Sequence, residues 1–110
     1  MSFPIEREEL RARLANGTIR LVDAQAPGWY EREHLPAALR AATDDVDGLL
    51  AALGPDLDTE IVVYCWNAAC TGSAYVAEQL EALGYRDVRR YVGGKQDWVD
   101  AGLPVETPVA

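Results

Sequence analysis

The chain has 110 residues, with 10 Lys and Arg against 18 Asp and Glu, which gives a formal net charge of −8. Its length is that of one domain, and 49% hydrophobic with 25% charged residues is the composition of a folded globular protein. The acidic balance argues against nucleic acid and anionic membranes as partners, because both bind clustered Lys and Arg. No stretch reaches the roughly 18 consecutive apolar residues of a membrane span. We therefore expect a single globular domain over residues 1–110.

The N-terminus turns acidic at once at Glu6, Glu8 and Glu9 and lacks an apolar run, so we expect no secretory signal. Without one, the expected compartment is the reducing cytoplasm. The chain has two cysteines, too few for a disulfide framework. Cys65 and Cys70 are therefore interpreted first as thiols or thiolates.

Helical and strand-like patterns alternate along the chain. In chain order they predict a helix over 7–15, a strand over 19–23, an irregular stretch over 24–36, a strand over 39–42 and a helix over 45–53. They then predict a strand over 60–64, a helix over 71–83, a strand over 88–92, a short helix after Gly93-Gly94 and an extended tail over 102–106. Segment 60–64 is a continuous apolar run, typical of a strand buried on both faces. The alternation predicts a three-layer α/β/α fold around a central, mostly parallel sheet of about five strands.

The helix over 71–83 has Val76, Leu80 and Leu83 at helical spacing. This spacing predicts an apolar stripe that faces the sheet.

Cys65 directly follows the most apolar strand and opens a short loop before a helix. In an open α/β sheet, chemistry gathers at the carboxyl ends of the strands. Backbone N–H groups in the loop and the positive end of the following helix stabilise negative charge, which lowers the pKa of a thiol there. We interpret Cys65 as a nucleophilic thiolate that water can reach. A small buried hydrophobe is the alternative interpretation.

Segments in five places resemble the rhodanese domain family, in the order in which that family has them. They are Leu21-Val22-Asp23, His34-Leu35-Pro36-Ala37-Ala38, the run from Ile61 through Cys65 and Cys70 to Ser73, Leu83-Gly84-Tyr85, and Gly93-Gly94 followed by Trp98 and Gly102-Leu103-Pro104. The resemblance covers about Glu6 to Val105, and the length fits the single-domain sulfurtransferases of the family. It implies that Cys65 takes a sulfane sulfur from a donor such as thiosulfate or a persulfide and carries it as a persulfide. The implied acceptor is thiophilic: a thiol, a protein cysteine, or cyanide in an assay.

The same resemblance implies a substrate-binding segment around the nucleophile. Its residues are Trp66, Asn67, Ala68, Ala69, Cys70 and Thr71, and the backbone of 66–70 is expected to form a cradle for anionic sulfur. The related phosphatases and arsenate reductases have an Arg six positions after the cysteine. Thr71 stands there in this chain, so the bidentate clamp that phosphate transfer needs is missing. The loop therefore favours sulfur transfer over phosphate transfer.

Several positions depart from the family pattern. Gln25 stands where the family usually has Arg, and Cys70 where it often has Arg or a small hydroxyl residue. Glu33 replaces the Gly before His34, and Ala68 replaces a Gly in the middle of the loop. The loop has no formal positive charge as a result. We expect weak affinity for thiosulfate, with a neutral or protein-bound persulfide as the better donor.

The spacing Cys-x4-Cys leaves two interpretations of Cys70 open. Cys70 resolves a persulfide or sulfenic acid on Cys65 by forming a disulfide, or it only fills a volume at the start of a helix. The first interpretation supports an alternative function. The chain would then be a non-catalytic rhodanese-like binding or redox-sensing module, gated by a Cys65–Cys70 disulfide.

Four aromatic residues lie near the expected site or the expected core. Trp29 and Tyr30 either rim the pocket or cover an edge of the core. Trp66 either faces an acceptor at the pocket mouth or packs, and Trp98 is expected to pack the last helix on the sheet.

His34 is interpreted as part of a structural turn, because it precedes Leu35-Pro36 and matches a turn of the family. A zinc site formed by His34, Cys65 and Cys70 would lack a fourth ligand, so we expect no metal and no cofactor. Lys95 and Arg40 are candidate cations, with a solvated surface position as the default for both. The sequence leaves the oligomeric state open.

Overall fold

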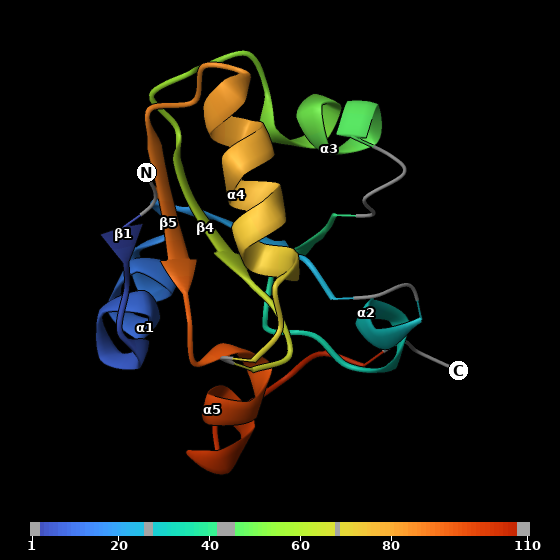
Figure 1. Cartoon of the computed structure of the whole chain (residues 1–110). Helices are drawn as coiled ribbons and strands as arrows, with labels where there is room; N and C mark the ends of the chain where they lie inside the picture. The colour runs from blue at the N-terminus through green and yellow to red at the C-terminus, as the bar shows by residue number, and fades with distance from the viewer. Residues whose placement is uncertain (1–2, 26–27, 42–45, 68, 108–110) are drawn as a thin grey trace.

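The computed structural model describes residues 3–25, 28–41, 46–67 and 69–107. Its elements alternate along the chain (Figure 1): β1 (Phe3–Pro4), α1 (Arg7–Asn16), β2 (Arg20–Asp23), α2 (Trp29–Arg32), β3 (Leu39–Arg40), α3 (Val46–Leu53), β4 (Glu60–Tyr64), α4 (Gly72–Ala82), β5 (Asp87–Tyr91) and α5 (Gly94–Asp100). Within the described ranges the strands form one sheet in the order β1-β5-β4-β2-β3, and each neighbouring pair is parallel. The predicted α/β fold around a parallel sheet is confirmed.

Strand β4 is the centre of the sheet and has the predicted bounds. Each residue from Ile61 to Tyr64 is fully buried. Ile61 and Val63 belong to the core cluster on one face, and Val62 and Tyr64 to the cluster on the other. This alternation follows from the two-residue period of a strand, and burial on both faces explains why the run is apolar throughout.

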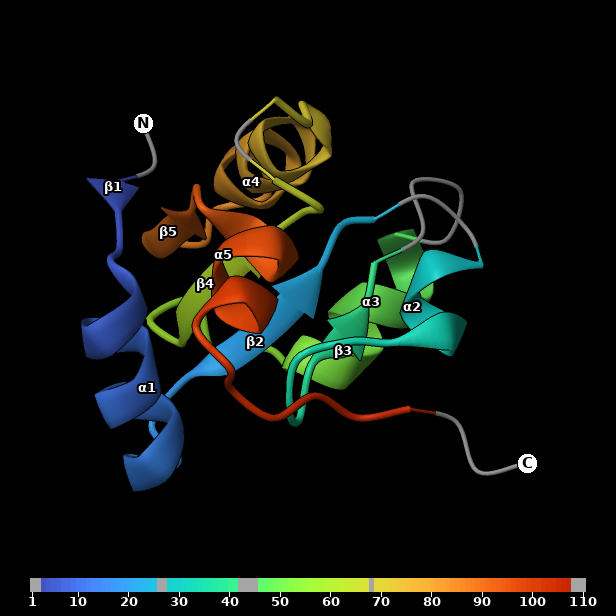
Figure 2. The ribbon, with the colours of Figure 1, turned by 90° about the horizontal axis from the view of Figure 1, so that it is seen from below.

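Helices cover the sheet on both sides, and each side has its own hydrophobic core. The core under α3 and α4 is formed by Val22, Ala24, Ala41, Leu49, Leu53, Ile61, Val63, Val76, Ala77, Leu80, Tyr85 and Val88. The core under α1 and α5 is formed by Ile5, Leu10, Leu21, Leu35, Ala38, Val62, Tyr64, Tyr91 and Trp98. Figure 2 shows α1 and α4 on opposite sides of β4. Helices on both faces of the sheet give the three layers, α/β/α, that the sequence predicts.

The apolar stripe of α4 differs from the prediction at one end. Val76 and Leu80 are buried as expected, but Leu83 is 47% exposed and lies just past the helix as its C-terminal cap. Ala77 packs on the sheet in its place. The prediction that Leu83 faces the sheet was wrong. The helix ends at Ala82, so Leu83 does not continue the helical spacing that would place it on the buried face.

Two short elements were not predicted. Strand β1 has two residues and pairs with β5 at the edge of the sheet, and α2 forms a single turn inside the stretch expected to be irregular. Neither has enough residues to show a period of 2 or 3.6. The predicted tail is extended, and its Glu106 pairs with His34 in an isolated antiparallel bridge.

The other boundaries lie within one or two residues of the predictions, as is usual where helix and strand ends fray. Helix α1 ends at Asn16, and the cap residue Gly17 has a φ of 68°, the left-handed conformation typical of a helix C-terminus. Ala42 and Asp45, the predicted end of one strand and start of one helix, lie outside the described residues. Every helix in the described part of the chain is too short or too polar to cross a bilayer.

Candidate functional site

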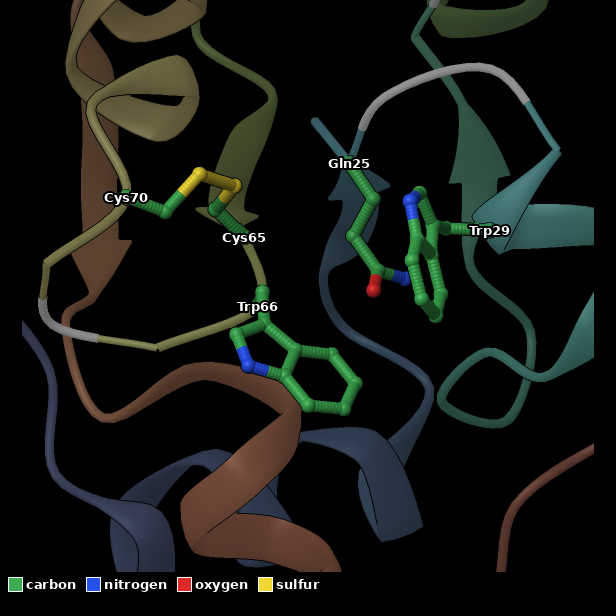
Figure 3. Close-up of a pocket in the computed structure, with 5 residues that line it drawn as sticks. All are labelled: Gln25, Trp29, Cys65, Trp66 and Cys70. Carbon is green, nitrogen blue, oxygen red and sulfur yellow. A yellow bond between two sulfur atoms is a disulfide. The ribbon is translucent and has the colours of Figure 1, made fainter.

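Cys65 lies at the carboxyl end of β4, where the chain leaves the sheet toward α4. This is the edge at which ligands bind in parallel α/β sheets. A cavity of about 450 Å³ opens beside it, lined by Gln25, Trp29, Cys65, Trp66 and Cys70 (Figure 3). Two distant parts of the chain therefore meet at the residue that the sequence marks as the nucleophile: one contributes Gln25 and Trp29, the other Cys65, Trp66 and Cys70.

The sulfur atoms of Cys65 and Cys70 are bonded to each other (Figure 3). Their Cα atoms are 6.1 Å apart, inside the range that a disulfide spans. Cys65 is only 2% exposed, and its Sγ lies 3.7 Å from the Ala24 carbonyl oxygen. In the disulfide form, Cys65 is therefore not the water-accessible thiolate that the sequence led us to expect. It becomes a thiol only when the Cys65–Cys70 bond is reduced. Cys70 also does more here than fill a volume.

Gly72, the first residue of α4, allows the helix to begin against this disulfide. A Cβ atom at position 72 would lie 2.7 Å from the Ala24 carbonyl oxygen and 3.4 Å from the Cys65 sulfur. No larger residue fits without moving the loop. Sequence reasoning gave Gly72 no role, although a glycine two positions after Cys70 is the signal that could have found it.

Helix α5 holds the nucleophile loop from the other side. The backbone N–H of Lys95 donates to the Cys65 carbonyl at 3.0 Å, and that of Gln96 donates to the Trp66 carbonyl at 2.8 Å. These are N–H groups at the start of a helix, which have no partner within the helix itself. The backbone at Cys65 is therefore set by the start of α5 as well as by β4.

We expect Gly94→Ala to lower the free energy of unfolding and to disturb the nucleophile loop. Gly94 has a φ of 67°, and a Cβ there would lie 2.5 Å from the Cys65 carbonyl oxygen. Gly102→Ala is the matched control, since Gly102 has a φ of 76° but nothing within 4 Å of the added Cβ. Urea denaturation should show a loss larger for Gly94→Ala by about 1–3 kcal/mol, the usual cost of overpacking. Equal losses in the two variants would show that only backbone conformation matters at Gly94.

In the disulfide form, some backbone N–H groups of the loop after Cys65 already donate hydrogen bonds within the loop. Asn67 accepts the N–H of Ala69 on its side-chain Oδ1 at 3.0 Å and the N–H of Cys70 on its backbone oxygen at 3.1 Å. Thr71 is the N-terminal cap residue of α4, and its carbonyl accepts the N–H of Tyr75 at 3.1 Å. Ala68, another expected cradle residue, lies outside the described residues. Two amides of the expected anion cradle, those of Ala69 and Cys70, therefore donate to Asn67 in this structure.

Asp23, at the end of β2, supports the opposite wall of the cavity. It is 1% exposed and accepts hydrogen bonds from the Tyr64 hydroxyl at 2.6 Å, the Gln25 backbone N–H at 2.8 Å and the Gln25 side-chain amide at 2.8 Å. Burial raises the pKa of the Asp23 carboxyl above its ordinary value, and these hydrogen bonds oppose the rise. The carboxyl group thereby fixes Gln25 at the cavity.

Trp29 and Trp66 form the aromatic part of the wall. Their ring centroids are 5.6 Å apart, and the two side chains are 41% and 39% exposed. The Lys95 ammonium lies 4.7 Å from the Trp66 ring centroid and 3.4 Å from Glu33 Oε1. Lys95 is 4% exposed, so its expected surface position was wrong: the indole and the carboxylate compensate for its burial. Of the two open interpretations for each Trp, the cavity position is the observed one.

The remaining candidates lie away from the cavity lining. Tyr30 packs against the core under α1 and α5, and its ring stacks on His34 at 3.9 Å. The Nδ1 atom of His34 is 2.8 Å from the Tyr30 carbonyl oxygen, which places His34 in a structural turn as predicted. Trp98 is buried and packs α5 on the sheet, also as predicted. Arg40 is exposed and pairs with Glu31 at 3.0 Å.

Among the described residues, no group of three or more His, Cys, Asp and Glu side chains is arranged to hold a metal ion.

A model of the rhodanese-like domain matches residues 6–101 of the chain. The chain belongs to the rhodanese-like domain family. Among curated relatives, it is 34% identical over 102 residues to an HTH-type transcriptional regulator of Mycobacterium tuberculosis, covering 93% of this chain and 44% of the regulator. It is 32% identical over 124 residues to a thiosulfate sulfurtransferase of Azotobacter vinelandii, covering 94% of this chain and 44% of that enzyme. This rhodanese-like domain thus spans less than half the length of these two relatives.

Solved structures share the fold. A thiosulfate sulfurtransferase of Pseudomonas aeruginosa has a TM-score of 0.81 at 26% identity, over 98% of this chain and 20% of that one. A human single-domain sulfurtransferase, TSTD1, has a TM-score of 0.77 at 24% identity, over 91% of this chain and 97% of that one. The second likeness, at its low identity, concerns the fold alone.

Proposed function

We propose that this rhodanese-like domain is a sulfurtransferase that carries sulfane sulfur as a persulfide on Cys65. The observation that carries the proposal is the position of Cys65, which directly follows the central strand β4 and lines a cavity at the carboxyl edge of the sheet. Relatives named thiosulfate sulfurtransferase, from Azotobacter vinelandii and Escherichia coli, support the same reaction class. The donor is a small molecule with sulfane sulfur, and the acceptor is a thiol or a protein cysteine.

The reaction begins with Cys65 reduced. Its thiolate attacks the outer sulfur of the donor, the donor's sulfur–sulfur bond breaks, and the leaving group departs with the electron pair as sulfite or a thiolate. The acceptor then attacks the outer sulfur of the persulfide and returns Cys65 as a thiolate. The segment Trp66–Thr71 is proposed to stabilise the anionic sulfur through its backbone N–H groups, with Asn67 releasing those of Ala69 and Cys70.

The test is to follow the sulfur on the reduced protein. After incubation with thiosulfate or an organic persulfide, mass spectrometry should show a gain of one sulfur atom on the peptide that contains Cys65. Addition of cyanide should then remove this sulfur and release thiocyanate. Failure of every sulfane donor to load Cys65 would refute the proposal.

A redox function of the same loop is the second candidate, and the Cys65–Cys70 bond is the observation that favours it. In the persulfide state, the Cys70 thiolate would attack the Cys65 sulfur, form the disulfide and expel hydrosulfide, so no external oxidant is needed. The bond would then hold the domain inactive until a reductant opens it. A non-catalytic binding module could be gated by this disulfide without catalysing any reaction. The relatives named thiosulfate sulfurtransferase favour the catalytic function instead. The cytoplasmic setting stays a prediction, and its reductants would keep the loop open.

A further inference from the structure

Lys95, the second residue of α5, has a buried ammonium group beside the nucleophile loop. The residue is 4% exposed, and its Nζ atom lies 3.4 Å from Glu33 Oε1 and donates to the Glu33 carbonyl oxygen at 3.4 Å. The same ammonium lies 4.7 Å from the centroid of the Trp66 ring. Removing a charge from water is unfavourable unless partners compensate, and here a carboxylate, a carbonyl and an indole face do so. The burial of this cation therefore depends on two other segments of the chain.

These contacts connect the two parts of the chain that line the cavity. Glu33 is the C-terminal cap residue of α2, the helix that begins with Trp29. Trp66 belongs to the loop after β4, and its ring centroid is 5.6 Å from that of Trp29. Both indoles line the cavity (Figure 3). One ammonium on α5 therefore joins the end of α2 to the indole of the nucleophile loop.

The backbone of the nucleophile loop is held by α5 independently of the disulfide. The N–H of Lys95 donates to the Cys65 carbonyl at 3.0 Å, and the N–H of Gln96 donates to the Trp66 carbonyl at 2.8 Å. Neither hydrogen bond uses a sulfur atom, so opening the disulfide removes neither of them. The Lys95 ammonium contacts the Trp66 ring rather than the disulfide, so its contact has the same independence.

We infer that Lys95 is a positioning residue: its ammonium, held by Glu33, keeps the Trp66 indole in the cavity wall whether the disulfide is closed or open. The inference rests on the proposed function and deepens it, because a donor that binds the reduced domain then meets a wall that is already formed. A preformed wall favours binding, since no side chain has to be ordered when the ligand arrives. In the described part of the chain, the cavity lining does not include Lys95, which therefore acts through Trp66.

Lys95→Met tests the ammonium, because methionine keeps an unbranched side chain and the backbone N–H that binds Cys65 but has no charge. Acrylamide quenching of Trp66 fluorescence is measured in a Trp29→Phe background, where the other tryptophan, Trp98, is 3% exposed and shielded from the quencher. Reduction of the disulfide should change the quenching constant less than about 1.5-fold when Lys95 is present. In Lys95→Met, reduction should raise it at least about twofold, because the indole is no longer held.

Steady-state kinetics with Trp29 intact give the second readout. With thiosulfate as donor and cyanide as acceptor, Lys95→Met should raise KM for thiosulfate about fivefold and leave kcat within about twofold. Loss of binding that is equal in the ground state and the transition state has this signature. A disturbed backbone at Cys65 would lower kcat instead.

Glu33→Gln and Arg40→Met are the companion variants. Glu33→Gln removes the carboxylate that holds Lys95, at a side chain that is 35% exposed, and should move both readouts in the same direction by a smaller factor. Arg40→Met removes an exposed ion pair with Glu31 of α2, at 3.0 Å, and should move neither readout.

The outcomes separate this inference from the proposed function. An equal rise in quenching on reduction, with and without the Lys95 ammonium, would show that Lys95 does not hold Trp66. A lower kcat with unchanged KM in Lys95→Met would show that Lys95 acts on the nucleophile rather than on the wall. If Lys95→Met does not fold, the same comparisons on Glu33→Gln decide. If no sulfur reaches Cys65 in any variant, the proposed function fails, while the quenching experiment still tests the position of Trp66.

Discussion

Cys65→Ser is expected to abolish sulfur transfer, with a loss of more than about a thousandfold in kcat/KM. A serine hydroxyl is not ionised near neutral pH and does not form a persulfide, so the carrier intermediate disappears. Thiocyanate release from cyanide measures the loss, and mass spectrometry should find no sulfur added to the variant. Turnover within tenfold of the wild type would show that another residue carries the sulfur.

The matched control for this variant is Cys70→Ser. Both substitutions remove the same disulfide, which joins residues separated by 5 positions. A loop this short contributes about 2 kcal/mol to stability in the chain-entropy description, and both variants lose the same amount. Any difference in turnover between them is therefore due to the chemistry of the remaining cysteine.

Cys70→Ser is expected to make the activity independent of reduction. In the wild type, the Cys65 sulfur is bonded to Cys70 and buried, so the oxidised protein has no nucleophile. Reduction should raise wild-type turnover at least about tenfold, whereas the variant should change less than about twofold. The measurement compares turnover before and after treatment with a reductant that is removed before the assay.

The lifetime of the persulfide gives a second readout on Cys70. Without an acceptor, the wild-type persulfide should decay with release of hydrosulfide as the disulfide forms, and the Cys70→Ser persulfide should persist. Equal activity of the wild type before and after reduction would contradict the gating role. Equal persulfide lifetimes would contradict resolution by Cys70.

Local sequence patterns were sufficient for the framework of the fold. The apolar run over 60–64, the helical pattern over 7–15 and the strand–loop–helix order around Cys65 predicted β4, helix α1 and the position of the candidate nucleophile. These features depend on burial and backbone conformation at neighbouring positions, which period and residue type reveal. The missed elements, β1 and α2, are too short for such a signal.

The chain alone thus determined a parallel α/β domain and placed a cysteine at the carboxyl edge of its sheet. Only the tertiary structure decided that Cys70 reaches Cys65, that Lys95 is buried beside Trp66, and that Gln25 and Trp29 come from a distant segment to complete the cavity. The physical reason is that the distances between these residues depend on how the helices and loops pack on the sheet. Spacing along the chain does not encode such distances.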